Sequence, residues 1–328
     1  MNIGSGLSGP VLCFGELLLR LACPSGNRLS ETADFKANAG GAEANVAAAL
    51  AQLGHRAEIV TAVPDGPLGE MALGRFRQLG VGTNFVTRAP GRLGLYFLEP
   101  GAGLRPSRIV YDRENSVFAA HAGDFDWPAL MREARWLHVS GITLALGDDA
   151  AHAAVAAASA ARDRGVPVSF DSNYRASLWE GRADEAAVLF RRMMEYSDVL
   201  FASPQDIERA TAQDSALAAF PRLAIVASTV REIGPDGGQR LSARVESRDG
   251  AADAGPVSLP ATVDRIGSGD AFAAGMIHGL LRGLPLSDIV AGGLAAFCLK
   301  HSISGDQWVG SSDELEQFDR LRRSDVQR

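Results

Sequence analysis

Short apolar runs alternate with helix-like segments along most of the chain, and this alternation restricts the fold more than any other sequence feature. The runs predicted to be strands are residues 11–14, 57–62, 136–139, 166–170, 199–201 and 223–227. Ala-rich segments with helical composition, such as residues 41–53 and 149–164, lie between some of them. Strands that alternate with helices form a parallel sheet covered on both faces. The sequence therefore predicts a Rossmann-like α/β fold with a mostly parallel sheet flanked by helices.

One region departs from this alternation. Residues 94–99 and 107–113 are strand-like, and a turn with glycine and proline joins them without a helix, so they predict a β-hairpin. With residues 17–22 and 28–35, the hairpin is expected to form a small β-sheet lid. The chain is thus expected to be one domain over residues 1–328, with lid segments near 16–36 and 92–118 inserted in it.

Composition limits the partners and the location of the protein. With 46% hydrophobic residues in 328, the chain can bury a large core. Its 39 acidic and 32 basic residues give a net charge of -7, which does not favour nucleic acid as a partner. Cys13, Cys23 and Cys298 lack metal-ligand spacing and suit a reducing compartment. Residues 1–10 do not resemble a signal peptide and no apolar run is long enough to span a bilayer, so we expect a cytoplasmic protein that does not enter a membrane.

The most informative motif is the sequence DRIGSGDAF at residues 264–272, which precedes a small-residue helix expected to reach about Gly283. Glycines before a helix let backbone N–H groups converge on an anion, and the helix dipole favours negative charge there. Gly267, Ser268 and Gly269 are therefore candidates for an anion hole. Asp270, in the first turn, could accept a proton from an attacking hydroxyl. An ordinary capped helix is the alternative explanation of this motif.

A second glycine-containing helix start, GGAEANVA at residues 40–47, lies near the amino end. Gly41 and Asn45 are four residues apart and share one helix face, where glycine leaves room for a ligand and the amide can bind hydroxyls. Close packing of small residues against another helix is the alternative explanation.

Together the two motifs carry a family resemblance. A Gly-Gly helix start near the amino end and a Gly-x-Gly-Asp helix near the carboxyl end are the signatures of the PfkB, or ribokinase-like, carbohydrate kinases, and the resemblance runs from Gly15 to about Trp308. Within that family the chain is most similar to 2-keto-3-deoxygluconate kinases, through GAEAN at 41–45, YDR at 111–113, DSNYR at 171–175 with LW at 178–179, TVRE at 229–232 and DR at 264–265. The resemblance implies ATP-dependent phosphorylation of the 6-hydroxyl of 2-keto-3-deoxygluconate, with Mg²⁺ and Asp270 as the base.

The resemblance also implies a sugar-acid site built from the helix starts and the lid. Its residues in this sequence are Gly40, Gly41, Asn45, Tyr96, Tyr111, Arg113, Arg175 and Asp270. The two-residue period of a strand puts Tyr111 and Arg113 on one face. A planar guanidinium binds a carboxylate through two bonds, so Arg113 and Arg175 are the expected partners of the acid group.

The nucleotide is expected at the carboxyl ends of strands, where Asp171, Ser203 and Ser228-Thr229 lie, although turn chemistry also explains such residues. By resemblance its ligands are Asn173, Ser228, Thr229, Arg231, Gly267 and Gly269. The sequence departs from the family at 203–206, which read SPQD where many members carry Asn-x-x-Glu, a segment associated with magnesium. Asp206 is accordingly the candidate metal residue, and a monovalent cation is a candidate near Asp264.

Two alternatives stay open. One is a kinase of the same family that acts on fructose, ribose or a galactonate-derived keto acid, since the motifs do not specify the epimer. The other is a catalytically silent regulator that binds a sugar or nucleotide, which the intact Gly-Ser-Gly-Asp argues against. The resemblance further suggests a homodimer, or a higher homo-oligomer, through the lid.

Overall fold

The computed structural model describes residues 3, 6–211, 215–234 and 238–325. The strands are β1 (Val11–Phe14), β2 (Leu18–Ala22), β3 (Lys36–Gly40), β4 (Ala57–Pro64), β5 (Gly82–Ala89), β6 (Gly94–Glu99), β7 (Arg108–Asp112), β8 (Trp136–Ser140), β9 (Val168–Asp171), β10 (Val199–Phe201), β11 (Ile225–Ile233), β12 (Gln239–Ser247) and β13 (Gly250–Leu259). The helices are α1 (Ala42–Gln52), α2 (Pro67–Gln78), α3 (Val117–His121), α4 (Trp127–Leu130), α5 (Gly141–Leu144), α6 (Asp148–Asp163), α7 (Ala183–Tyr196), α8 (Pro204–Thr211), α9 (Ala216–Ala219), α10 (Ser268–Leu281), α11 (Leu286–Lys300) and α12 (Ser312–Asp325), with 3₁₀ turns at Ala122–Asp124 and Ala176–Leu178.

Nine strands of the described chain form the main sheet, in the order β13-β12-β11-β10-β9-β8-β1-β4-β5. All neighbours from β11 to β5 run parallel, which confirms the predicted α/β sheet. The antiparallel edge of β12 and β13 was not predicted. β11 continues to Ile233, beyond the expected end at residue 227, because β12 pairs with it over its whole length.

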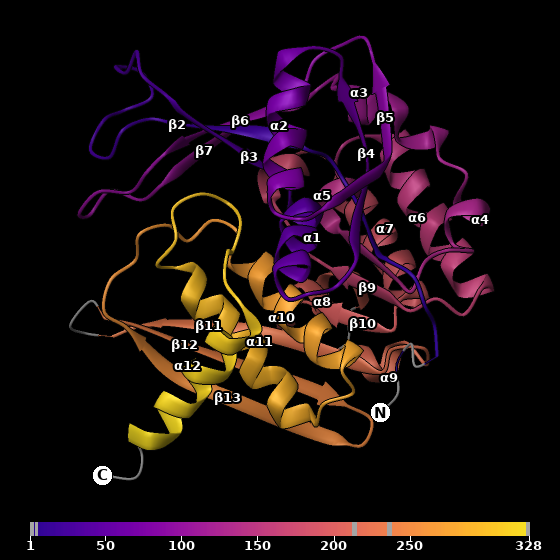
Figure 1. Cartoon of the computed structure of the whole chain (residues 1–328), viewed down its shortest axis with the longest axis vertical. Helices are drawn as coiled ribbons and strands as arrows, with labels where there is room; N and C mark the ends of the chain where they lie inside the picture. The colour runs from indigo at the N-terminus through magenta and orange to yellow at the C-terminus, as the bar shows by residue number, and fades with distance from the viewer. Residues whose placement is uncertain (1–2, 4–5, 212–214, 235–237, 326–328) are drawn as a thin grey trace.

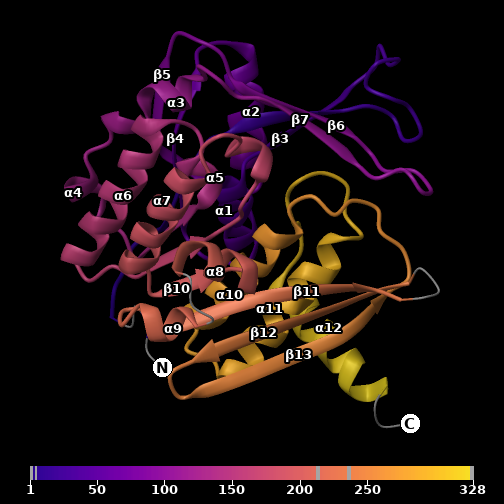
Figure 2. The same ribbon diagram turned by 180° about the vertical axis from the view of Figure 1, so that it is seen from behind.

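Alternate side chains of the central strand β1 enter two different cores. Val11 and Cys13 pack with side chains of α1, α2, α10 and α11, whereas Leu12 and Phe14 pack with those of α3, α4, α6 and α7. The two sets of helices lie on opposite sides of the sheet (Figures 1 and 2). A strand buried on both faces is continuously apolar, which is why the short runs in the sequence were informative.

The second sheet, β3-β2-β6-β7, is the sheet expected to form the lid, and in Figure 1 it projects from the α/β body at the level of α2. β6 and β7 form the predicted antiparallel hairpin, and β2 lies within the expected segment 17–22. The fourth lid strand was misplaced: β3 spans Lys36–Gly40, not residues 28–35. Residues 28–35 form turns, and the strand that pairs with β2 is the one that runs directly into α1.

The starts of two helices face the carboxyl edge of the main sheet. They lie near β1, which pairs with β4 on one side and with β8 on the other, so the strand order reverses at this point. α1 begins after Gly41 and α10 after Gly267, both of which have positive φ. α1 and α10 pack together, so the two predicted motifs are neighbours in space. In the described part of the chain, no helix has the length and apolar character needed to cross a membrane.

Candidate active site

A cavity of about 660 Å³ lies between the lid, the helix starts and the carboxyl edge of the sheet. The predicted site residues that line it are Gly41, Asn45, Tyr96, Tyr111, Arg113, Asn173, Arg175, Arg231, Gly267, Ser268, Gly269 and Asp270. Gly40, Ser228, Thr229 and Asp206 lie outside this lining. Segments separated by more than 200 residues in the sequence therefore share one cavity.

Asp270 is the central carboxylate of the cavity. It is buried, and its Oδ2 accepts a hydrogen bond from Asn45 Nδ2 at 2.7 Å. Burial raises the pKa of Asp270 to about 8, helped by the charges of Asp171 and Glu43 and opposed by the Asn45 hydrogen bond and by Arg175. A carboxylate with a pKa near neutrality can accept a proton from a weak acid more readily than an ordinary one.

The first turn of α10 supplies backbone donors next to Asp270. Gly267 has φ 80°, and a Cβ at this position would be 1.8 Å from the carbonyl oxygen of Asp306, so a glycine is required. The Ala271 N–H donates to the Gly267 carbonyl at 2.9 Å and closes the first turn. The N–H groups of Gly269 and Asp270 precede that bond in the first turn, and both residues line the cavity, so this helix start is a place where an anion can bind.

The two predicted acid-binding arginines differ in their surroundings. Arg113 Nε lies 2.5 Å from Glu16 Oε2, and both side chains are buried. Glu16 was not predicted from the sequence as a partner of Arg113. Arg175 is exposed and makes no ion pair with another side chain of the described residues. Arg175 thus has its whole guanidinium available to a ligand, and Arg113 only the nitrogens that Glu16 leaves.

The segment after β9 contributes Asp171 and Asn173. Burial raises the pKa of Asp171 to about 7, against the charge of Arg175. The Asn173 N–H donates to Asp171 Oδ1 at 3.1 Å, and Asn173 adopts φ 38°, so the chain turns sharply here. This turn places Asn173 and Arg175 on the cavity wall.

Asp206, the candidate metal residue, has a full set of local partners. Its Oδ2 accepts hydrogen bonds from Ser172 Oγ and Ser203 Oγ, both at 2.9 Å, and Arg209 lies 2.6 Å from Oδ1. Among the residues that the structure describes, no group of three or more His, Cys, Asp or Glu side chains could hold a metal ion.

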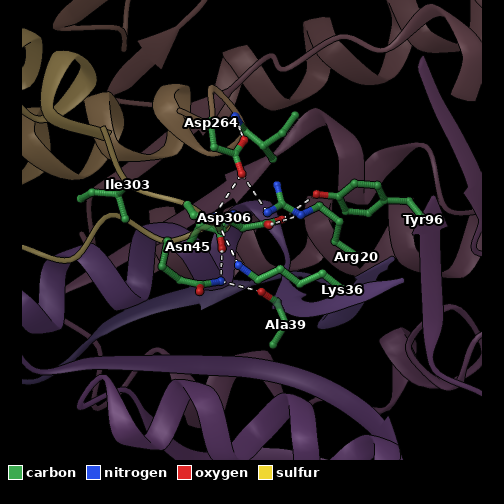
Figure 3. Close-up of polar contacts among 12 residues, drawn as sticks. Arg20, Lys36, Ala39, Asn45, Tyr96, Asp264, Ile303 and Asp306 are labelled. Atoms are coloured by element: carbon green, nitrogen blue, oxygen red, sulfur yellow. Dashed lines mark hydrogen bonds and ion pairs between the residues drawn. The ribbon is translucent and has the colours of Figure 1, made fainter. Parts of the chain in front are cut away.

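A buried charge cluster that the sequence analysis missed connects the lid to the start of α10 (Figure 3). Arg20 of β2 lies 2.8 Å from Asp264 Oδ2 and 3.1 Å from Asp306 Oδ1. The Tyr96 hydroxyl donates to Asp306 Oδ2 at 2.7 Å. Burial raises the pKa of Asp306 to about 6, and Arg20 opposes the shift. An arginine in the otherwise apolar strand LLRLA was the sequence signal for this cluster.

Arg231 lies on the side of the cavity formed by β11. Its Nη1 donates to Gln239 Oε1 at 2.8 Å and its Nη2 is 2.7 Å from His301 Nε2. Ser228 and Thr229 are half-buried in the same strand, in the middle of it rather than at its end. Arg265, a further lining residue, was predicted only as part of a motif.

Comparisons with known proteins show the family to which the chain belongs. The family model described as pfkB family carbohydrate kinase matches residues 10–307. The 2-dehydro-3-deoxygalactonokinase of Haloferax volcanii is 31% identical over 98% of this chain and 99% of its own, and the 2-dehydro-3-deoxygluconokinase of Bacillus subtilis is 28% identical over 89% and 90%. The crystal structure of 2-dehydro-3-deoxygluconokinase from Thermotoga maritima has a TM-score of 0.88 and 39% identity, covering 95% of this chain and 98% of that one. The chain belongs to the pfkB family of carbohydrate kinases and is an ATP-dependent sugar kinase.

Proposed function

We propose that the protein transfers the γ-phosphoryl group of ATP to the 6-hydroxyl of 2-keto-3-deoxygluconate. The observation that carries this proposal is that Asp270, the start of α10 and Arg175 line the same cavity. The first two supply a base and an anion hole, and the third supplies a guanidinium for a carboxylate. The names of the Bacillus and Thermotoga relatives support the same substrate class.

Asp270 would act as the base. Its ionised carboxylate accepts the proton of the 6-hydroxyl while that oxygen bonds to the γ-phosphorus and the bond to the β,γ-bridging oxygen breaks, which releases ADP. Asn45 holds the carboxylate through the 2.7 Å hydrogen bond. Gly41 lines the cavity beside Asn45, and a Cβ at Gly41 would lie 2.3 Å from the Glu16 carbonyl oxygen, so glycine permits the close approach of β3 to this backbone. A Cβ at Gly40 would lie 2.4 Å from Asp306 Oδ2.

The backbone N–H groups at the start of α10, in the predicted anion hole of Gly267, Ser268 and Gly269, would stabilise the charge on the transferred group, since the helix start is fixed before the reaction begins. Magnesium, when bound, would offset the negative charge of the phosphate groups. We assign Asn173, Ser228, Thr229 and Arg231 to the nucleotide. Asp206 is the candidate carboxylate that would hold magnesium, although it already has Ser172, Ser203 and Arg209 as partners.

The acid end of the sugar would meet the lid. Arg175 and Arg113 would bind the carboxylate, with Tyr96 and Tyr111 beside them. Tyr96 is held by its bond to Asp306, so its ring is fixed against the substrate. A neutral sugar would leave these guanidinium groups without their anionic partner, and the site would bind it less tightly.

A galactonate-derived keto acid is the second candidate substrate. The Haloferax relative, which spans almost the whole chain, is named for that epimer. Both epimers carry the same carboxylate and the same terminal hydroxyl, so Arg175 and Asp270 serve either one.

Replacement of Asp270 by asparagine tests the chemistry. Asn keeps the size and can accept the Asn45 hydrogen bond, so Asp270→Asn should bind ATP normally in calorimetry and lose turnover by about 10²-fold or more, the usual contribution of a general base. The fold should survive the change. Because the pKa of Asp270 in the folded state lies above its unfolded value, ionisation of Asp270 destabilises the fold increasingly as pH rises toward about 8. Removal of the carboxylate charge should therefore raise the melting temperature most at that pH. Near-normal turnover in this variant would exclude Asp270 as the base.

A further inference from the structure

Lys300 is a fully buried cation at the end of α11, close to the active site. Its exposed fraction is 0%, and only two of the 32 basic residues of the chain are lysines. The Lys300 Nζ donates to the Ile303 carbonyl oxygen at 2.9 Å and to the Asp264 carbonyl oxygen at 3.3 Å. The buried ammonium is therefore held by backbone carbonyl groups, without a carboxylate in direct contact among the ion pairs of the described residues.

The two carbonyl groups come from two loops that meet at the anion hole. One loop runs from Val263 to Gly267 and the other from His301 to Asp306. They are joined by hydrogen bonds from the Val263 N–H to the His301 carbonyl at 2.7 Å and from the Gly305 N–H to Asp264 Oδ2 at 3.1 Å. Figure 3 shows Asp264, Ile303 and Asp306 around this junction. The Lys300 ammonium connects the two loops, because it donates to one carbonyl group of each.

The charges around Lys300 favour its ionised form. Burial lowers its pKa, but Asp264, Asp306 and Asp270 act in the opposite direction, with Arg20 adding to the lowering. Asp264 and Asp306 are themselves paired with Arg20. Two cations, Lys300 and Arg20, thus lie among the carboxylates of Asp264, Asp306 and Asp270.

We propose that the Lys300 ammonium is a tethered monovalent cation: it holds the loops that shape the anion hole, and it makes the kinase independent of free potassium or other alkali ions. Backbone carbonyl oxygens are ligands that potassium and ammonium ions share, and two of them accept hydrogen bonds from the Lys300 Nζ. The candidate site for a monovalent cation near Asp264 is therefore supplied by the protein itself. Lys300 is a positioning residue, because it bonds to Asp264 and Ile303 in the two loops that contain Gly267 and Asp306.

The choice of lysine over arginine fits this role. Arginine serves almost everywhere else in this chain, but a planar guanidinium with five donors is too wide for two carbonyl oxygens around one point charge. A compact ammonium with tetrahedral donors matches them. Lys300→Arg should therefore not retain the function of the wild-type lysine, although it keeps the charge.

The wild-type enzyme gives the first test. ATP turnover is measured with magnesium present and with either tetramethylammonium, which is too large to enter such a site, or potassium as the only monovalent cation. The two rates should agree within about twofold, since one hydrogen-bonded cation is already present. A rate that depends strongly on potassium would overturn the proposal. The ratio does not depend on which sugar acid is the acceptor.

Lys300→Ala gives the second test, because it removes the tethered charge and leaves space for an ion. In tetramethylammonium its kcat should fall by about 10²-fold, as for a damaged oxyanion hole, with the KM of the sugar acid changed much less. Potassium or ammonium should restore at least about tenfold of that loss, whereas the wild type does not respond. The matched control is Lys36→Ala: Lys36 is exposed, is the other lysine, and donates to Ser304 of the same loop at 3.2 Å. It should show no cation dependence.

Thermal unfolding separates this proposal from the proposed function. Potassium should raise the melting temperature of Lys300→Ala above its value in tetramethylammonium, and should leave that of the wild type unchanged. A folded Lys300→Ala that responds equally to both salts, in stability and in rate, contradicts the proposal. If the variant does not fold in either salt, the wild-type comparison decides. A failure to phosphorylate any sugar acid would refute the proposed substrate but leave the unfolding result valid.

Discussion

Asp270 combines three features that a general base requires: burial, a hydrogen-bonded orientation and neighbouring carboxylates. Burial and the neighbouring carboxylates raise the pKa of Asp270 to about 8, whereas the Asn45 hydrogen bond lowers it. Burial likewise raises the pKa of Asp171 to about 7, and the charge of Asp171 adds to the shift of Asp270. The pH dependence of the reaction is therefore a direct readout of this residue.

The acid limb of the pH profile should lie well above that of an ordinary carboxylate. Because the ionised form of Asp270 is the active one and its pKa is about 8, kcat/KM should rise with pH through the neutral range and level off above it. The measurement is kcat/KM for the sugar acid at saturating ATP and magnesium across that range. A profile that is already flat from about pH 5.5, as an unperturbed carboxylate would give, contradicts the assignment.

Arg175 should discriminate the sugar acid from neutral sugars. Hydrogen bonds to charged groups contribute about 1.5–3 kcal/mol, so Arg175→Ala should raise KM for the sugar acid by about tenfold to 10²-fold while KM for ATP moves much less. Lysine should rescue in part, because it keeps the charge but not the two-bond fork. Arg191→Ala, an exposed arginine away from the cavity, is the control. Equal losses for acid and neutral acceptors would assign Arg175 to the phosphates or the fold.

Arg113 is a less direct probe of the same question. Removal of its guanidinium leaves Glu16 buried without its partner, and breaking a buried pair costs about 3–5 kcal/mol. Arg113→Ala should therefore lower stability as well as binding. A variant at Arg113 is informative only beside its own unfolding curve.

At the scale of elements, the start of α10 should tolerate change at one position and not at the next. Gly267→Ala forces a methyl group against the Asp306 carbonyl and a positive φ on alanine, so it should reduce kcat by about 10²-fold or more and lower stability. Ser268→Ala should be mild, because alanine keeps the backbone of the helix start, including the hydrogen bond from the Ser268 N–H to the Arg265 carbonyl. Steady-state rates and melting curves of the two variants check the order.

The reverse result at this helix start is equally informative. If Ser268→Ala abolishes turnover with the fold intact, its hydroxyl takes part in the reaction. Gly269 offers a separate comparison, because a Cβ there meets open space within 4 Å and not backbone. A side chain at Gly269 should thus impair ligand binding without the loss of stability expected at Gly267.

The sequence allowed local features to be predicted and left distant pairings unresolved. Both helix starts were predictable because glycine motifs act within one turn, and β6 was predicted with its observed bounds. The pairing of Arg20 with Asp264 and Asp306 joins segments more than 200 residues apart, and a single sequence carries no signal of such partners. The pairing of Glu16 with Arg113 was not predicted for the same reason. The lid strand β3 was displaced because its position depends on pairing with β2.

The missed antiparallel edge did carry a local signal. In β12, Leu241, Ala243 and Val245 are buried and alternate with less buried side chains, which is the pattern of a strand covered on one face. This pattern differs from the continuous apolar runs of the parallel strands. A search for both patterns would have predicted β12.

At the scale of the whole molecule, the outer face of the lid is unusually apolar. Phe35 and Val110 are each 40% exposed, and Phe97, which pairs with Val110 and contacts Phe35, lies between them. We expect two copies to associate through this face as a homodimer. Light scattering should give twice the chain mass, and Val110→Asp should give the monomer mass. A wild type that is monomeric at every concentration would contradict this expectation.

The central claim is that the same cavity contains the base for phosphoryl transfer, Asp270, and an arginine that recognises the carboxylate of a sugar acid, Arg175. ADP release should be measured with 2-keto-3-deoxygluconate, its galactonate-derived epimer, fructose and ribose, and the position of the new phosphate established by ³¹P NMR. The account predicts a 6-phosphate on the keto-deoxy acids, with kcat/KM at least about 10²-fold above that of either neutral sugar. A neutral sugar that matches or exceeds the acids, or a product phosphorylated elsewhere than the 6-hydroxyl, would contradict it.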